Sequence, residues 1–291
     1  MNRADTRKTR AGVSTAPYSD LYIYYLKGHL GSDLDLATEE FIGNWEEDEF
    51  SFLFFSRPAL NKIESLVTVQ PQLALIDEYR MSYADWLGEM PAPFQAGSFV
   101  VTPPWITDDP LVKASDENRL ILLDPGLVFG TGTHPTTRDC LAAIERIFGM
   151  GCPLNLLDLG TGSGLLSLAA ARLGAARILA VDINWLAAET AGKNVRRNRL
   201  ENRILTVRGR AEDFIDLSTD LVIANIHYDV MKRLISAGGF LRNKWFILSG
   251  LLRSQAKDVE LRLARMPVRI RQRWDHDSIW HTFMGEVLHQ D

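Results

Sequence analysis

One short segment, LDLGTGSG at residues 157–164, constrains the fold of this chain more than any other feature. Its three glycines alternate with small polar residues. The segment begins at the end of the apolar run 154–157. It is followed directly by a helical pattern over 165–173 that ends at Gly174. Glycines at this spacing let the backbone turn sharply and let a ligand touch the main chain. The segment therefore predicts a buried strand, a ligand-binding turn and a helix with a glycine C-cap.

Apolar runs and helical patterns alternate after residue 120, and this alternation sets the fold class. Strand–helix alternation at this spacing predicts a doubly wound sheet of mostly parallel strands, flanked by helices. A last pair of runs near the end of the chain adds a terminal antiparallel strand. We predict an α/β fold with a helix through Asn198 and with strands at 154–157, 178–181, 204–207, 221–224, 245–248, 268–273 and 279–283.

The front of the chain predicts a smaller α+β unit. Strands are indicated at 21–27 and 49–55, and helices at 35–45 and 59–67. Prolines between residues 91 and 110 break any long helix and indicate a linker, opened by a short helix through Trp86. We divide the chain into a flexible tail at 1–17, a small domain at 18–77, a linker at 78–115 and a second domain at 116–291.

Charge is spread unevenly between these parts. The whole chain has a net charge of −5, yet residues 1–95 hold eight Lys/Arg and fifteen Asp/Glu. An acidic unit repels phosphate backbones and suits a basic partner, so we expect no direct nucleic-acid binding. The alternative is that this charge only keeps the protein in solution.

Composition excludes several classes of protein. Hydrophobic residues make up 46% and charged residues 24% of the chain, which is typical of a globular protein. No run of about 18 apolar residues occurs, so we expect no membrane-spanning helix. Two cysteines cannot build a disulfide framework or a four-cysteine zinc site, and the histidines have no metal spacing. We therefore predict a cytoplasmic protein without a bound metal.

The polar residues around the glycine turn indicate which cofactor it binds. Asp182 ends the second predicted strand, 22 residues after Gly160, where a carboxylate can accept hydrogen bonds from ribose hydroxyls. A dinucleotide fingerprint would place its last glycine at Leu165, and no Gly-Lys-Ser/Thr follows for a phosphate loop. The observed G-x-G-x-G form resembles enzymes that use S-adenosylmethionine. Glu212 and Asp213 follow the third strand and either reach the adenine edge or cap a helix.

Two further segments belong to the predicted site. The run DPGLVFGTGTHPTT at 124–137 is dense in glycine and threonine, which favours a ligand loop. Pro135 suits the first position of a helix that runs to about Phe148, with His134 or Thr133 as its cap. Asn225 ends the fourth strand, at the sheet edge where ligands of such folds bind. Its amide oxygen can accept a hydrogen bond from a substrate amine and aim the nitrogen lone pair at a methyl group.

Three motifs together resemble one family. DPGLVFGTGTHPTT, LLDLGTGSGLLSLAAARLGAARILAVDIN and VIANI are similar to the PrmA-type methyltransferases of ribosomal protein L11. The resemblance implies a ferredoxin-like domain that recognises the substrate, a linker and a class I methyltransferase domain. It also implies transfer of methyl groups from S-adenosylmethionine to α-amino and lysine amines. The implied cofactor positions are Thr137, Gly160, Asp182 and Asn225, to which the glycine turn adds Gly162. Asn225 is also the implied catalytic residue.

Other functions stay open at this point. The substrate could be lysines of another protein or the amine of a nucleic-acid base. Enzymes that act on base amines usually resemble Asn-Pro-Pro-Tyr/Phe here, whereas this chain has Ile226 and His227 in place of the prolines. A non-catalytic cofactor-binding module and a nicotinamide oxidoreductase are the remaining alternatives. We expect a monomer that binds a basic protein, most simply ribosomal protein L11.

Overall fold

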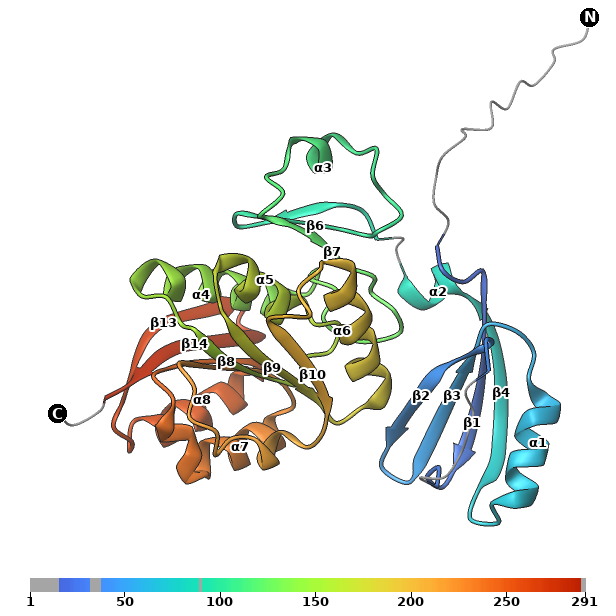
Figure 1. The fold of residues 1–291 in the computed structure, drawn as a ribbon. Helices are drawn as coiled ribbons and strands as arrows, with labels where there is room; N and C mark the ends of the chain where they lie inside the picture. Colours follow the sequence, from blue (N-terminus) through green and yellow to red (C-terminus); the bar gives the residue numbers. More distant parts are fainter. Residues whose placement is uncertain (1–15, 32–37, 89–90, 289–291) are drawn as a thin grey trace, which may run out of the picture.

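The computed structural model describes residues 16–31, 38–88 and 91–288, so most of the predicted tail at 1–17 lies outside it. Figure 1 shows a small sheet with one helix beside a larger α/β body, and a short three-stranded sheet next to that body. Among the described residues, no helix is long and apolar enough to cross a membrane.

The small unit is an antiparallel sheet with strand order β2-β3-β1-β4. Helix α1 packs on it through a core that includes Leu53, Phe55 and Ile63. The Tyr24 hydroxyl accepts a 2.7 Å hydrogen bond from the backbone N–H of Ala59, just before α1 begins. The elements are β1 (Asp20–Lys27), β2 (Phe41–Glu47), β3 (Phe50–Phe55), α1 (Leu60–Val69), β4 (Ala74–Ser82) and the short helix α2 (Tyr83–Leu87).

The predicted helix at 35–45 is wrong over residues 38–45, because 38–40 form a turn and 41–45 belong to β2; residues 35–37 lie outside the described part of the chain. Residues 46–49, an acidic run, close a hairpin in which β2 pairs with β3 and Asp48 adopts a left-handed conformation. Pairing across this hairpin overrides the weak helical spacing of the segment. The predicted domain boundary after residue 77 falls inside β4, which pairs with β1 as far as Ser82.

The proline-rich segment contains a three-stranded sheet with order β5-β6-β7. Strands β5 and β6 form a hairpin, and β6 pairs in parallel with β7. The residue ranges are β5 (Phe94–Ala96), β6 (Phe99–Thr102), α3 (Pro110–Ala114) and β7 (Leu120–Leu122). The predicted linker at 78–115 therefore holds part of a sheet that ends beyond it.

The large body confirms the predicted class I methyltransferase fold. Its sheet has order β10-β9-β8-β11-β12-β14-β13, with β8 to β12 parallel and β14 antiparallel to both of its neighbours. The strands are β8 (Asn155–Leu159), β9 (Arg177–Asp182), β10 (Ile204–Arg208), β11 (Leu221–Asn225), β12 (Trp245–Leu252), β13 (Val268–His276) and β14 (Trp280–Val287).

Helices cover both faces of this sheet (Figure 1). One core lies between the sheet and the side that carries α4 and α5, and a second core lies under α7 and α8. The elements are α4 (Pro135–Met150), α5 (Leu165–Leu173), α6 (Trp185–Arg197), α7 (Tyr228–Ser236) and α8 (Arg253–Leu263), with 3-10 turns η1 (Ala211–Asp213) and η2 (Gly238–Arg242). The carboxyl ends of β8, β9 and β11 meet at one edge, where the site residues lie.

Candidate active site

The glycine turn follows β8, and two of its glycines have no room for a side chain. A Cβ on Gly160 would lie 2.1 Å from Ile226 Cγ2, and one on Gly162 would lie 2.5 Å from the Phe129 carbonyl oxygen. Both glycines have positive φ, +74° and +56°. The turn therefore requires glycine for its backbone shape and for the close approach of neighbouring chain segments.

Asp158 holds the glycine turn in place through hydrogen bonds. It is fully buried and accepts hydrogen bonds from Thr161 Oγ1 at 2.7 Å and from Ser167 Oγ at 2.6 Å. Burial raises the pKa of this carboxyl, and the two hydroxyl donors oppose that rise. Asp158 thus ties the turn to the first residues of α5, which makes its role structural.

Asp182 ends β9 and joins two segments of the site. Its Oδ2 accepts from the backbone N–H of Gly162 at 3.0 Å, and its Oδ1 accepts from the backbone N–H of Asn184 at 2.9 Å. Burial raises the pKa of Asp182, while the two backbone donors favour the ionised form. A carboxylate oxygen can accept more than one hydrogen bond, so Asp182 can also accept from ligand hydroxyls.

The loop at 124–137 lies against the glycine turn. Ser163 donates from its Oγ to the Gly130 carbonyl at 2.6 Å and from its N–H to the Phe129 carbonyl at 3.0 Å. The Phe129 side chain is 72% exposed, so the loop presents an aromatic ring beside the turn. The loop is therefore attached to the turn through its backbone and leaves this side chain available to a ligand.

The loop ends in the predicted helix cap. His134 is the N-cap of α4, Pro135 is its first residue, and the helix continues two residues beyond the predicted end at Phe148. Thr136 donates from its backbone N–H to His134 Nδ1, and its Oγ1 lies 2.7 Å from the same nitrogen. Burial lowers the pKa of His134, which favours the neutral imidazole.

Asn225 ends β11 and contacts this cap. Its Nδ2 donates to Thr136 Oγ1 at 3.4 Å. Its Oδ1 lies beside Gly250, where a Cβ would come within 2.9 Å of it. Thr137 is buried in the first turn of α4, and its Oγ1 has no hydrogen-bond partner among the described residues. Buried hydroxyls are seldom left without a hydrogen-bond partner, so this one is unusual.

Several of the predicted site residues line one cavity of about 440 Å³. It brings together Gly160, Gly162, Asp182 and Asn225, whereas neither Thr136 nor Thr137 lines it. Val128 and Phe129 belong to the predicted ligand loop, and Ile226 and His227 follow Asn225. Sequence reasoning did not indicate several other lining residues, among them Trp45, which comes from a distant segment of the chain. The lining residues that the sequence did not indicate are Trp45, Val181, Ile183, Ala187, Gly209, Arg210, Ala211, Val230 and Arg233.

The two acidic residues after β10, Glu212 and Asp213, differ in their position relative to the cavity. Glu212 lines the cavity, but it forms ion pairs with Arg233 at 2.6 Å and Arg210 at 3.5 Å. Asp213 is outside the cavity lining, and both residues lie on η1. Glu212 is thus the one of the pair that is placed to meet an adenine edge.

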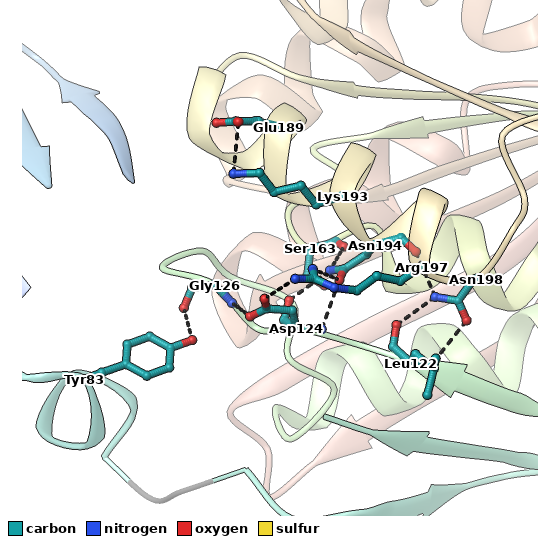
Figure 2. A network of polar contacts seen from close by, with 10 residues as sticks. All are labelled: Tyr83, Leu122, Asp124, Gly126, Ser163, Glu189, Lys193, Asn194, Arg197 and Asn198. Carbon is teal, nitrogen blue, oxygen red and sulfur yellow. Dashed lines mark hydrogen bonds and ion pairs between the residues drawn. The ribbon is translucent and has the colours of Figure 1, made fainter. Parts of the chain in front are cut away.

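A polar network of side chains on α6 and α2 supports the loop (Figure 2). Asn194 on α6 donates to the carbonyls of Asp124 and Ser163, both at 2.9 Å, and accepts from the N–H of Asp124 at 3.0 Å. Arg197 pairs with the Asp124 carboxylate at 2.9 Å, and Tyr83 donates to the carbonyl of Gly126 at 3.1 Å. The network therefore connects the small unit, the loop and the glycine turn.

Several arginines near the end of the chain form ion pairs with acidic residues. Arg269 and Arg271 pair with Glu286, Arg273 pairs with Glu260, and Arg262 pairs with Asp258. This pairing is typical of a solvated surface. Within the described ranges, no three His, Cys, Asp or Glu side chains group closely enough to hold a metal ion.

The residues of the cavity fit an adenosine-bearing cofactor that lacks a pyrophosphate. Asp182 has a carboxylate that can accept from ribose hydroxyls, and the main chain of Gly160 and Gly162 lines the same cavity. The volume is within the usual range for small-molecule sites. These features match the S-adenosylmethionine site that the sequence predicts.

Comparison with known proteins gives consistent matches. Residues 61–286 match the family model described as "Ribosomal protein L11 methyltransferase (PrmA)". A protein of that name from Staphylococcus haemolyticus is 33% identical over 249 residues, covering 82% of this chain and 78% of the relative. One from Geobacillus thermodenitrificans is 38% identical over 169 residues, which is 56% of this chain and about half, 51%, of the relative. The crystal structure of a ribosomal protein L11 methylase from Lactobacillus delbrueckii subsp. bulgaricus has a TM-score of 0.58 and 28% identity, covering 68% of this chain and all of the other.

Proposed function

Because the chain belongs to the ribosomal protein L11 methyltransferase (PrmA) family, we propose that it transfers methyl groups from S-adenosylmethionine to amino groups of ribosomal protein L11. One observation carries the proposal: Asn225 faces the same cavity as the glycine turn and Asp182. An acceptor for an amine and an acceptor for a ribose thus share one site. The amines are lysine side chains, the N-terminal amine or both.

At the cofactor end, the chain binds mainly through its backbone. The main chain at Gly160 and Gly162 lines the cavity, and Asp182 accepts hydrogen bonds from the ribose hydroxyls. Thr137 on α4 is the one proposed cofactor position that does not line the cavity, and its buried Oγ1 has no hydrogen-bond partner among the described residues. Bound S-adenosylmethionine supplies an electrophilic methyl carbon on a sulfonium sulfur.

At the amine end, Asn225 orients the nucleophile. Its Oδ1 accepts a hydrogen bond from the neutral amine, which turns the nitrogen lone pair toward the methyl carbon. As the N–C bond forms, the C–S bond breaks and its electron pair goes to sulfur. Thr136 holds the Asn225 amide through its Oγ1, and the neutral His134 ring holds Thr136. Position and desolvation, rather than a strong base, carry this step.

We assign substrate recognition to the small unit, from β1 to α2, and methyl transfer to the body from residue 116 onward. The acidic balance of residues 1–95 supports a basic protein as the partner. We further propose that the enzyme is cytoplasmic and monomeric and that it makes no direct contact with RNA. Two cysteines that form no disulfide agree with a reducing compartment.

One structural observation disfavours the base-amine alternative. Tyr228 occupies the aromatic position of the base-methylating pattern, but its hydroxyl donates to Asp258 on α8 at 2.7 Å. It is also absent from the cavity lining. Tyr228 therefore packs between helices rather than facing a flipped base. Lysines of another protein remain the second candidate substrate.

Transfer of a labelled methyl group tests the proposal. The purified enzyme is incubated with labelled cofactor and recombinant L11, free RNA or a mixture of other ribosomal proteins. We expect label on L11 at amine positions, located by mass spectrometry, and its loss with Asn225→Ala. Label only on another protein would move the proposal to that substrate, and label on RNA would refute it.

A further inference from the structure

The cofactor cavity has one wall that comes from the other sheet. Trp45 lies on β2 of the small unit, yet it lines the cavity together with Asp182 and Ile183. We propose that Trp45 is a cofactor-binding residue whose indole faces the adenosine part of S-adenosylmethionine. The inference rests on the cofactor site proposed above. It assigns a binding role to a domain otherwise expected only to recognise the substrate.

Close packing brings β2 to the site. A Cβ on Gly43 would lie 2.5 Å from Leu186 Cδ1, and the buried Leu186 side chain has little space to move away. The Phe41 ring stacks on Trp185 at 6.2 Å between centroids. Both contacts join β2 to the beginning of α6, and Figure 1 shows β2 at the side of its sheet that is nearest this helix.

An ion pair fixes the strand beside Trp45. Glu46 pairs with Arg208 at 3.4 Å, and the Arg208 Nε also donates to the Ile183 carbonyl at 3.3 Å. Arg208 thus connects β2 with the residue that follows Asp182. Because this pair is partly exposed, its role is to position β2 rather than to add much stability.

These contacts place the indole near the ribose side of the cavity. Trp45 packs in one apolar cluster with Val128 and Ala187, which line the cavity too. Ala187 lies in the first turn of α6, just after Asp182 at the end of β9. Asn225 lies at the end of β11. Because β8 lies between β9 and β11, the axes of those two strands are about 10 Å apart. The methyl-transfer end is therefore remote from Trp45.

An indole in this position suits a flat, partly polar ligand. Aromatic rings stack on nucleobases without reading their edges, and stacking contributes a measurable part of the affinity. The half-buried Trp45 ring would also exclude water from the bound adenosine. Binding of the cofactor would consequently depend on the small sheet being docked on α6.

Calorimetric titration of the full chain tests this inference with S-adenosylmethionine, S-adenosylhomocysteine and adenosine. We expect Trp45→Ala to weaken all three about tenfold and Trp45→Phe to weaken them about threefold at most. Trp86→Ala is the matched control, because Trp86 is also on the small unit but contacts Phe54 and does not line the cavity. Its affinities should equal those of the wild type.

Tryptophan fluorescence gives a second readout. Titration with S-adenosylhomocysteine should change the emission of wild type and Trp86→Phe, and the change should be smaller in Trp45→Phe. Asp182→Ala reports on the site itself. If Asp182→Ala weakens binding while both Trp45 variants bind as the wild type does, the inference is wrong and the site stands. If Asp182→Ala also binds normally, the proposed site is wrong. An effect of Trp45→Ala on S-adenosylmethionine but not on adenosine would overturn the adenosine assignment.

Discussion

The contact between Gly160 and Ile226 allows a quantitative test of the glycine turn. In Gly160→Ala, the new Cβ would lie 2.1 Å from Ile226 Cγ2, well inside an ordinary carbon–carbon distance of about 4 Å. The positive φ of +74° costs an L-residue about 1–2 kcal/mol. The overlap adds about 1–3 kcal/mol, the usual penalty for overpacking. We therefore expect Gly160→Ala to lower the free energy of unfolding by about 2–5 kcal/mol.

A double-mutant cycle separates these two contributions. Ile226→Ala removes Cγ2, and the Cβ of residue 226 is 3.6 Å from the new methyl group, which is an ordinary contact. In the Ile226→Ala background, Gly160→Ala should cost only the φ penalty. Urea unfolding of the four proteins should then give a favourable coupling free energy of about 1–3 kcal/mol. Additive effects, within about 0.5 kcal/mol, would mean that the close approach does not require glycine at position 160.

Three further substitutions test separate parts of the site. Asp182→Ala should weaken S-adenosylmethionine binding at least tenfold by calorimetry, because it removes the proposed ribose acceptor and the partner of the Gly162 N–H. Asn225→Ala should lower kcat on L11 far more than it weakens cofactor binding; full activity would contradict its role toward the amine. Asn194→Ala should lower the free energy of unfolding by about 3 kcal/mol in urea, since it leaves buried carbonyl groups of Asp124 and Ser163 without their donor. A loss below about 0.5 kcal/mol would show that the network in Figure 2 contributes little.

The parts of the fold that could be predicted are those encoded by local patterns. The glycine turn, the parallel strands and the His134-Pro135 helix start each depend on residues that are adjacent in the sequence. The prediction failed at β2, whose hairpin partner and docking surface are remote. That error also hid Trp45, because a helix over 35–45 gives no reason to place its side chain in a cofactor site. Resemblance to a family supplied Thr137, which no spacing argument would have singled out.

Gly250 is another residue whose structural role could not be predicted from the sequence. It follows Ser249 in β12, and nothing in its sequence neighbourhood marks it as part of the site. The structure places Asn225 Oδ1 where a side chain at position 250 would lie. Such a requirement comes from two strands that become neighbours only in the folded sheet, so a single sequence does not reveal it.

The double role of Asp182 predicts opposite pH effects on folding and on binding. Burial raises its pKa in the folded protein above that of the unfolded chain, so between the two values the folded state holds more protons. The contribution of Asp182 to stability should therefore rise as the pH falls through this window. Cofactor affinity should fall in the same window, because a protonated carboxyl loses acceptor capacity for the ribose.

The Asp182→Asn variant has no titratable group at this position, so comparison with it separates both effects from the titration of other groups. One of these is the buried Asp158, whose pKa is raised by burial and by the charge of Asp182. The difference between wild type and Asp182→Asn in thermal midpoint and in cofactor affinity should move in opposite directions as the pH falls. If the two differences moved together, Asp182 would serve only to hold the glycine turn, and the ribose acceptor would have to be another residue of the cavity.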